Sequence, residues 1–279
     1  MSTLQPQSYK SPTKPIWCPG CGDYAVLNAL MRTFADLELP PEEIVVASGI
    51  GCSSRFPAFL KTYGFHGVHG RPLPLATGIK LANPQRTVVA VGGDGDGFSI
   101  GGGHISHAAR RNVDITYIVM DNNIYGMTKG QPSPTTPSGV QRKASPYGTQ
   151  EDPLNPLMLL LACNASFVAR AFSGEIKQMI EIFKAAIQHK GFSFVQVLSP
   201  CVTLYNTYEH YKEITRPLPE DHDPTDLMAA IRLAFEVESQ YLGIFYRDPH
   251  RPTYTQRMQT TRDSAAPTTI EEVMKHYVR

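Results

Sequence analysis

The stretch Gly92–Gln131, GGDGDGFSIGGGHISHAARRNVDITYIVMDNNIYGMTKGQ, decides the fold of this chain. An apolar run, Thr87–Gly93, leads into its glycines and aspartates, and a helix-like segment follows them. A second apolar run, Val113–Met120, then ends at an Asp-Asn-Asn triplet, residues 121–123. These patterns predict one strand–loop–helix–strand unit that carries oxygen ligands at both strand ends.

Strands and helices alternate on both sides of this unit. Apolar strands are predicted at Ile44–Ser48 and Phe192–Leu198, and an amphipathic helix at Gly174–His189. Such alternation is typical of an α/β fold in which helices flank a mainly parallel sheet. Cys52, the glycine–aspartate turn, the Asp-Asn-Asn triplet and Cys201 each follow a predicted strand directly. Because the carboxyl ends of parallel strands share one edge, where ligands bind, we expect these residues to lie together.

The bulk composition excludes several classes of protein. With 42% hydrophobic residues, 18% charged residues and a formal net charge of +1, the chain is expected to be globular, without a nucleic-acid or membrane partner. No apolar run approaches the roughly 18 residues that cross a bilayer, and the first residues lack the apolar core of a signal peptide. We therefore expect a cytoplasmic protein, in which five cysteines indicate metal binding or catalysis rather than disulfides.

The chain is predicted to have three parts. Residues 1–16 form an N-terminal arm, residues 17–215 form the domain that holds the motifs, and residues 216–279 form a C-terminal helix and tail. Within the second part, the proline-bearing stretch 131–155 has no clear periodicity. A loop of this length in a compact domain is typical of a lid or a docking segment.

Local signals predict several helix positions. Asp23 is expected to cap the helix that follows the first two cysteines, and a helix near Ser99 would follow the glycine–aspartate turn. Further helices are predicted at Leu73–Ala82 and Pro224–Gln240.

The glycine–aspartate turn and the asparagines have the chemistry of a magnesium and diphosphate site. Magnesium takes carboxylate, amide and carbonyl oxygens, while glycines and a helix start let backbone amides approach a diphosphate. Asp94 lies in Gly-Asp-Gly, and 26 residues (96–121) separate that triplet from Asn122. The register of Asp96 leaves 24 residues (98–121) and also fits, but Asp94 lies nearer the strand end. A dinucleotide site is not favoured, since no clean G-x-G-x-x-G is present.

The cysteine pattern favours an iron–sulfur cluster. The run CPGC, residues 18–21, resembles the thioredoxin redox motif with its glycine and proline exchanged, but that interpretation leaves Cys52 and Cys201 without a role. A zinc site would typically place two close pairs, whereas iron–sulfur clusters accept four thiolates from scattered loops. Cys163 lies in an apolar run, where a buried structural thiol is expected.

Six segments together resemble the β subunit, which binds thiamine diphosphate, of the 2-oxoacid:ferredoxin oxidoreductases. They are WCPGCGD (17–23), SGIGCSSR (48–55), HGRPLPLATGIKLANP (69–84), GGDGDGFSIGGGH (92–104), DNNIYGMTKGQ (121–131) and SPC (199–201). The HGR and YGMTKGQ segments are most similar to the 2-oxoglutarate branch of the family. Pyruvate and other 2-oxoacids are the alternative substrates. The resemblance implies the thiamine diphosphate-binding fold.

The resemblance also implies roles for individual residues. The ligands of a 4Fe–4S cluster would be Cys18, Cys21, Cys52 and Cys201. The magnesium ligands would be Asp94, Asn122 and the backbone carbonyl of Ile124. The diphosphate contacts would be Gly95, Asp96, Gly126, Met127 and Thr128. The residues near the thiamine rings would be Ile50, Gly51, Cys52 and Ser53.

Two further side chains have alternative roles. With Cys52, His69 would be the catalytic residue, approaching the diphosphate or the substrate; otherwise it makes a structural hydrogen bond. Arg55 would grip the distal carboxylate of 2-oxoglutarate, because a guanidinium binds a carboxylate through two hydrogen bonds. Otherwise Arg55 is a solvated surface residue.

The activity implied by the resemblance is the oxidative decarboxylation of 2-oxoglutarate to succinyl-CoA and CO₂, with coenzyme A as co-substrate. Electrons would pass singly through the cluster to ferredoxin, and the reaction would be reversible. Thiamine activation also needs a glutamate from a second domain of comparable size, for which this chain has no room. We therefore expect an α subunit to supply it in an (αβ)₂ heterotetramer. The alternative from another class is an iron–sulfur electron-carrier or sensor module.

Overall fold

An eight-stranded sheet forms the centre of the computed structural model, which describes residues 4–236, 238–265 and 268–277. The strand order is β2-β1-β3-β4-β8-β7-β10-β9, and all neighbours are parallel except β10 and β7. The strands are β1 (Ile44–Ser48), β2 (Tyr63–His66), β3 (Thr87–Gly93), β4 (Ile115–Asp121), β7 (Phe167–Phe172), β8 (Phe192–Leu198), β9 (Thr215–Pro217) and β10 (Gln240–Arg247). The predicted α/β fold with a mainly parallel sheet is confirmed.

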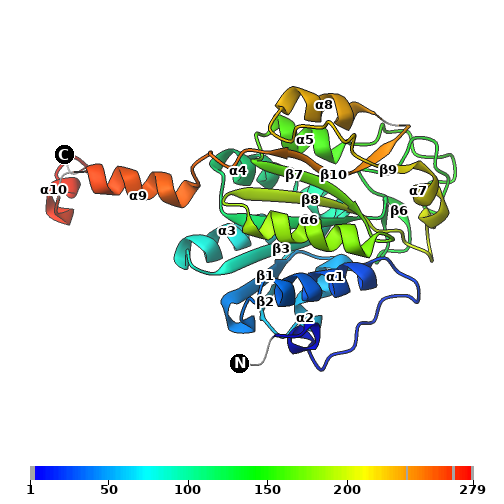
Figure 1. Cartoon of the computed structure of the whole chain (residues 1–279), viewed down its shortest axis with the longest axis horizontal. Coiled ribbons are helices and arrows are strands. Elements are labelled where there is room, and N and C mark those ends of the chain that lie inside the picture. The colour runs from blue at the N-terminus through cyan, green and yellow to red at the C-terminus, as the bar shows by residue number, and fades with distance from the viewer. Residues whose placement is uncertain (1–3, 237, 266–267, 278–279) are drawn as a thin grey trace.

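Helices cover both faces of the sheet, and an apolar core lies under each layer (Figure 1). On one face lie α1 (Asp23–Asp36), α2 (Phe56–Phe59) and α6 (Ile176–Gln188). On the other lie α3 (Pro72–Ala82), α4 (Gly102–Arg111), α5 (Pro156–Ala162) and α8 (Leu227–Phe235). Because both faces are covered, the central strands are apolar almost throughout and show little alternation.

The remaining elements lie at the ends of the sheet. Short 3-10 turns occur at η1 (Pro6–Tyr9), η2 (Pro41–Glu43) and η3 (Ser53–Arg55). A small antiparallel pair, β5 (Ile124–Tyr125) with β6 (Gln131–Pro132), follows β4. Beyond β8 comes α7 (Tyr208–Ile214), while α9 (Tyr254–Ser264) and α10 (Ile270–Met274) project away from the body (Figure 1). No helix in the described ranges is long and apolar enough to cross a membrane.

The segment between β3 and α4 differs in detail from the predicted helix near Ser99. A π-helical turn, η4 (Asp96–Ile100), comes first, and α4 begins at Gly102. Helix α4 ends at Asn112, whose φ of 55° gives the left-handed cap that asparagine tolerates. The strand–loop–helix–strand unit is therefore present, with β3 and β4 paired in parallel.

Two local predictions were wrong. Gly22 is the residue before α1, whereas Asp23 is its first residue and accepts a hydrogen bond from Ser199 Oγ at 2.9 Å. The helix expected over Pro224–Gln240 ends at Phe235, because Gln240 begins β10, which pairs with β7. Strand β10 has inward-facing Leu242 and Phe245 but half-buried neighbours, so its apolar signal is weak.

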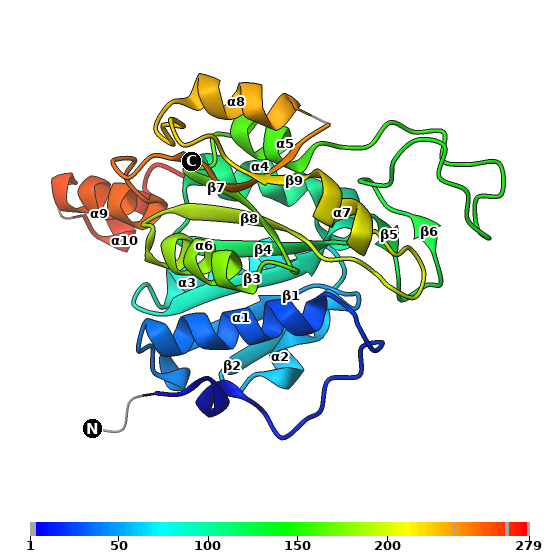
Figure 2. The ribbon, with the colours of Figure 1, turned by 45° about the vertical axis from the view of Figure 1, so that its right-hand side comes forward.

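The ends of the chain pack differently. In the predicted N-terminal arm, Tyr9 is buried and its hydroxyl donates to the carbonyls of Phe34 and Leu39; residues 1–3 lie outside the described part. The last predicted part contributes β10 to the central sheet, and its boundary at residue 215 stays a prediction. The stretch 131–155 is mainly loop and extends from the body beside β6 (Figure 2).

Candidate functional site

The first cavity at the carboxyl edge of the sheet, the aspartate cavity, has a volume of about 110 Å³. Its walls come from the loops after β1, β3 and β4, together with His69. Every residue expected at magnesium, the diphosphate or thiamine lines it. These are Ile50, Gly51, Cys52, Ser53, His69, Asp94, Gly95, Asp96, Asn122, Ile124, Gly126, Met127 and Thr128. Tyr125 also lines the cavity and was not expected; its hydroxyl donates to the carbonyl of Gly95 at 3.2 Å.

Asp94 is held in a buried network of carboxylates. It is 1% exposed, and Thr135 Oγ1 lies 2.9 Å from its Oδ2 and 2.7 Å from Oδ1 of Asp121. Burial, and then the neighbouring Asp121, raises the pKa of Asp94. Burial also raises the pKa of Asp121. Since a divalent cation offsets buried negative charge, Asp94 fits a magnesium site, and Asn122, whose Oδ1 accepts from Ile124 N at 3.0 Å, lines the same cavity.

The Asp96 carboxylate holds three loops together. Its Oδ1 accepts hydrogen bonds from Ile50 N at 2.9 Å, Gly70 N at 2.7 Å and His69 Nδ1 at 2.5 Å. A Cβ at residue 49 would collide with this carboxylate, so glycine is required there. Because Asp96 occupies Nδ1 of His69, the Nε2 atom remains for contacts in the cavity. The other oxygen of this carboxylate, Oδ2, is buried and has no hydrogen-bond partner among the described residues.

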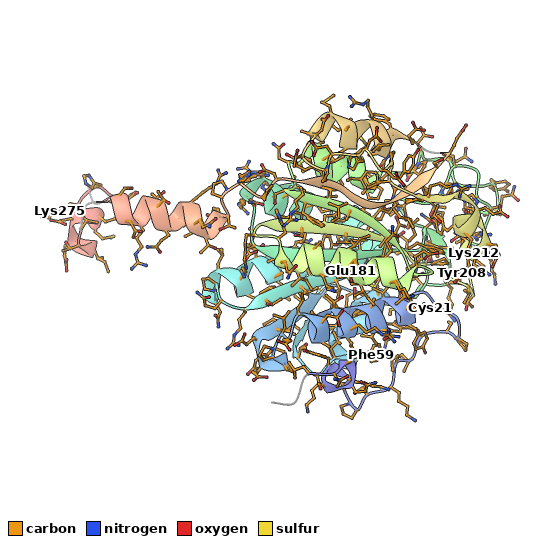
Figure 3. The ribbon with its side chains drawn as sticks, viewed as in Figure 1. Cys21, Phe59, Glu181, Tyr208, Lys212 and Lys275 are labelled. Carbon is orange, nitrogen blue, oxygen red and sulfur yellow. The ribbon has the colours of Figure 1, made fainter. Side chains whose placement is uncertain are left out.

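The second cavity, the cysteine cavity, brings Cys18, Cys21, Cys52 and Cys201 together in about 250 Å³. Figure 3 shows Cys21 at the amino end of α1, on the side of the molecule where α7 lies. All four are free thiols. A Cβ at residue 126 would lie 3.6 Å from Cys52 Sγ and 4.0 Å from Cys201 Sγ, so glycine keeps space between them.

The four thiols do not form a site for a single metal ion. Among the described residues, no three cysteine, histidine or acidic side chains are placed to bind one ion. A 4Fe–4S cluster offers a separate iron to each thiolate, so it fits a wider arrangement. Burial, and then Asp23, raises the pKa of Cys21, and the same two causes raise the pKa of Cys52 to about 11. The thiols of Cys21 and Cys52 are therefore neutral until a metal displaces their protons.

Trp17 supports the cysteine cavity and was missed as a site residue. Its ring packs against Tyr24, Phe56 and Phe59, and its Nε1 donates to the carbonyl of Cys52 at 2.7 Å. The signal that could have found it is the only tryptophan of the chain standing next to Cys18. Aromatic packing of Trp17 and one hydrogen bond thus fix the backbone of Cys52.

The two cavities share a wall. Cys52, Asn122, Gly126 and Met127 line both of them. Arg55 lines only the cysteine cavity, where Lys129 adds a second cation that sequence reasoning missed. Lys129 has a φ of 79°, a strained value that would have been visible only in the structure.

Cys163 does not belong to either cavity. It follows α5, is half-buried and packs against the core on the face of α3 and α4. Its packing against apolar side chains agrees with the structural role that was expected for this thiol.

Comparisons with known proteins agree with this geometry. Residues 49–197 match the family described as thiamine pyrophosphate enzyme, C-terminal TPP binding domain. Residues 201–263 match the family of the C-terminal part of the pyruvate ferredoxin oxidoreductase β subunit. The 2-oxoacid:ferredoxin oxidoreductase 1, subunit beta, of Aeropyrum pernix is 43% identical over 265 residues, which cover 90% of this chain and 83% of the relative.

Two further matches carry the name of 2-oxoglutarate. The 2-oxoglutarate synthase subunit KorB of Methanocaldococcus jannaschii is 45% identical over 193 residues, 69% of this chain and 72% of the relative. A solved 2-oxoglutarate:ferredoxin oxidoreductase from Magnetococcus marinus, with 2-oxoglutarate, coenzyme A and succinyl-CoA bound, superposes with a TM-score of 0.94. It is 41% identical, and the match covers 100% of this chain and 97% of that one. The chain therefore belongs to the β-subunit family of the 2-oxoacid:ferredoxin oxidoreductases, as its motifs predicted, and carries their TPP-binding domain.

Proposed function

We propose that this chain is the β subunit of a 2-oxoglutarate:ferredoxin oxidoreductase. The reaction converts 2-oxoglutarate and coenzyme A to succinyl-CoA and CO₂ and delivers two electrons, one at a time, to two oxidised ferredoxins. The observation that carries the proposal is the shared wall of the aspartate and cysteine cavities. Cys52 lines both cavities, so a cluster bound to Cys52 would lie beside thiamine diphosphate in the aspartate cavity. A reaction that removes electrons one at a time requires this proximity. Two of the similar proteins are named after 2-oxoglutarate, which supports the choice of this substrate.

The aspartate cavity would hold magnesium and thiamine diphosphate. Asp94, Asn122 and the carbonyl of Ile124 would bind the metal, while the backbone at Gly95, Asp96, Gly126, Met127 and Thr128 would contact the diphosphate. When bound, thiamine diphosphate would supply a nucleophilic carbon for the keto group and a cationic ring that accepts the electron pair left by decarboxylation. His69, oriented through Nδ1 by Asp96, would present Nε2 to the diphosphate or the substrate.

The cysteine cavity would hold the 4Fe–4S cluster on Cys18, Cys21, Cys52 and Cys201. Gly126 leaves the space between two of these thiols open. Because burial, and then Asp23, raises the pKa of Cys21 and Cys52, cluster binding must release protons.

Arg55 would select the dicarboxylic substrate by pairing with its distal carboxylate. Arg55→Ala should lower kcat/KM for 2-oxoglutarate by about 10- to 100-fold, the effect of losing a charge-assisted pair, and change kcat/KM for pyruvate much less. Arg32→Ala is the matched control, since Arg32 is exposed on α1 and, among the residues that the structure describes, forms a hydrogen bond to Asn28 alone. Equal losses for both substrates would remove Arg55 from the substrate site.

A partner α subunit would supply the glutamate that activates thiamine. Neither cavity is lined by a glutamate in the part of the chain that the structure describes. The β-subunit names of the relatives support the same conclusion, and we propose an (αβ)₂ assembly.

The test compares the chain alone with the chain co-expressed with its α subunit, both prepared without oxygen. The chain alone should be brown, with about four irons, and inactive, whereas the complex should contain thiamine diphosphate and reduce ferredoxin with 2-oxoglutarate and coenzyme A. Full activity of the chain alone would contradict the shared active centre. A brown complex without thiamine would favour the electron-carrier alternative.

A further inference from the structure

A third cavity lies apart from the two already described. It has a volume of about 320 Å³ and shares no lining residue with them. Its floor is Arg170 of β7 and Gln196 of β8, and α7 forms one wall with Tyr211 and Ile214. Figure 3 marks α7 by the labels of Tyr208 and Lys212. We call it the Arg170 cavity, and the proposed function assigns it no role.

Arg170 is a buried cation with unused hydrogen-bond donors. It is 4% exposed, and its Nε donates to Gln196 Oε1 at 2.9 Å. The two terminal nitrogens donate no hydrogen bond to a residue that the structure describes, and the guanidinium carbon lies 5.6 Å from the centre of the Phe245 ring. Burial lowers the pKa of Arg170 to about 10, so it remains charged at neutral pH. A buried guanidinium is costly unless its donors are satisfied, which indicates that an acceptor enters the cavity.

The nearest acid does not supply that acceptor. Oδ2 of Asp121 accepts from Gln196 Nε2 at 2.8 Å, so Gln196 stands between the carboxylate and the guanidinium. Oδ1 of Asp121 is occupied by Thr135 at 2.7 Å and Asn123 at 3.1 Å. Arg170 and Asp121 therefore interact across Gln196 rather than through a direct hydrogen bond.

The rim of the cavity carries two ionisable side chains. His210 of α7 and Glu236 after α8 both line it and are exposed. Neither forms an ion pair with Arg170 in the described structure. The rest of the wall includes apolar side chains, among them Leu154, Leu198 and Ala234. The cavity thus combines one deep cation with two acids, Asp121 and Glu236, and with a wall of mixed polar and apolar side chains, as small-molecule sites often do.

We propose that the Arg170 cavity binds a small organic oxyanion, a carboxylate or a phosphate, on the terminal nitrogens of Arg170. A planar guanidinium matches both groups through paired hydrogen bonds, and the apolar wall accommodates a short carbon skeleton. The cavity lies behind the aspartate cavity, because Thr135 contacts both Asp121 and Asp94. A ligand there is placed to influence the proposed metal site, but its binding does not depend on the proposed function.

The experiment is calorimetric titration of the full chain with succinate in one arm and inorganic phosphate in the other. Saturating magnesium and thiamine diphosphate are present, so that the aspartate cavity is occupied. Wild-type chain should bind at least one of the two anions, and Arg170→Gln should weaken that binding by tenfold or more, about the effect of losing one charge-assisted pair. The arm that responds identifies the oxyanion as a carboxylate or a phosphate.

A milder pair of variants keeps the test decisive if Arg170→Gln does not fold. His210→Glu places a negative charge at the exposed rim and should weaken binding about threefold by repulsion. His250→Glu makes the same change at an exposed turn after β10 that does not line the cavity, and should have no effect. Absence, at millimolar anion, of any binding component that Arg170→Gln weakens would overturn the proposal. Equal effects of the two histidine variants would also overturn it.

The outcome is separable from that of the proposed function. If the chain fails to bind thiamine diphosphate, phosphate entering the aspartate cavity would be insensitive to Arg170→Gln and His210→Glu. If the proposed reaction is confirmed and neither anion binds, Arg170 is a structural partner of Gln196. The oxyanion site is then refuted, while the proposed function stands.

Discussion

The aspartate cavity and the cysteine cavity meet at Cys52, yet they are held together in different ways. Hydrogen bonds preform the first, since Asp96 and Thr135 tie its loops and carboxylates together without any ligand. The second draws its cysteines from three separate segments and is supported mainly by the aromatic packing of Trp17. The difference teaches that a network of hydrogen bonds builds the aspartate side, whereas aromatic packing and a single indole hydrogen bond support the cysteine side.

The largest effect is expected from removing the residue that the two cavities share. Cys52→Ala should abolish the cluster and reduce 2-oxoglutarate-dependent ferredoxin reduction in the complex by at least about a thousandfold, because no electron acceptor would remain beside thiamine. Iron analysis and steady-state kinetics measure both results. Cys163→Ala is the control, since that thiol lies outside both cavities. If the Cys52→Ala complex kept its iron and its activity, Cys52 would not be the residue that links the two cavities.

A second pair of variants should separate the two sides. Asp94→Asn should weaken magnesium-dependent binding of thiamine diphosphate by about 100-fold or more while the iron content stays unchanged. Cys201→Ser should give the opposite result, loss of the cluster with retained thiamine binding. Without ligands, Asp94→Asn should not lower stability, because it removes a buried charge beside Asp121. If each variant lost both cofactors, the two cavities would be one cooperative unit.

The sequence predicted the aspartate side more directly than the cysteine side for a physical reason. Asp94 and Asn122 belong to one strand–loop–helix–strand unit, so their spacing along the chain already carries their geometry. The cysteines come from distant segments, and only the rule that parallel strands end at one edge brought Cys52 and Cys201 together. Family resemblance then supplied individual roles that spacing alone did not.

Other features could not be predicted because they depend on tertiary packing. Strand β10 has a weak apolar pattern and joins the sheet through pairing with β7. Arg170 lies in a strand whose pattern gives no reason to single it out, and only its neighbours on β8 and α7 create a cavity around it. Asp23 looked like a helix cap, but the loop after β8 brings Ser199 to its carboxylate instead.

The buried carboxylate of Asp23 gives a pH-dependent test on the cysteine side. Asp23 is 2% exposed, and burial raises its pKa to about 6. Below about pH 4 the carboxyl is protonated in both folded and unfolded chains, so its ionisation costs nothing. Between about pH 4 and 6 the unfolded chain loses this proton while the folded chain keeps it, so the stability of the wild type falls relative to Asp23→Asn and levels off above pH 6.

The expected gain of Asp23→Asn is up to about 3 kcal/mol above pH 6, the equivalent of two pKa units, and close to zero at pH 4. Urea unfolding of the iron-free chain across this range measures it. Asp221→Asn, at an exposed position, should show no such trend. A gain that did not depend on pH would mean that packing, not charge, decides the effect.

The smallest effect is expected from Trp17→Phe, which tests how far packing alone supports the cysteine cavity. Phenylalanine keeps aromatic contact with Phe56 and Phe59 but removes the hydrogen bond from Nε1 to the carbonyl of Cys52. One such bond contributes about 1 kcal/mol, so the iron-free chain should lose about that much stability.

With iron, the cluster should still assemble, because its four thiolate bonds outweigh one hydrogen bond. Its reduction potential should shift by a few tens of millivolts at most, measurable by a redox titration, since hydrogen bonding near the ligands tunes clusters. Loss of the cluster in Trp17→Phe would show that the indole hydrogen bond, rather than aromatic packing, is what positions Cys52 between the two cavities.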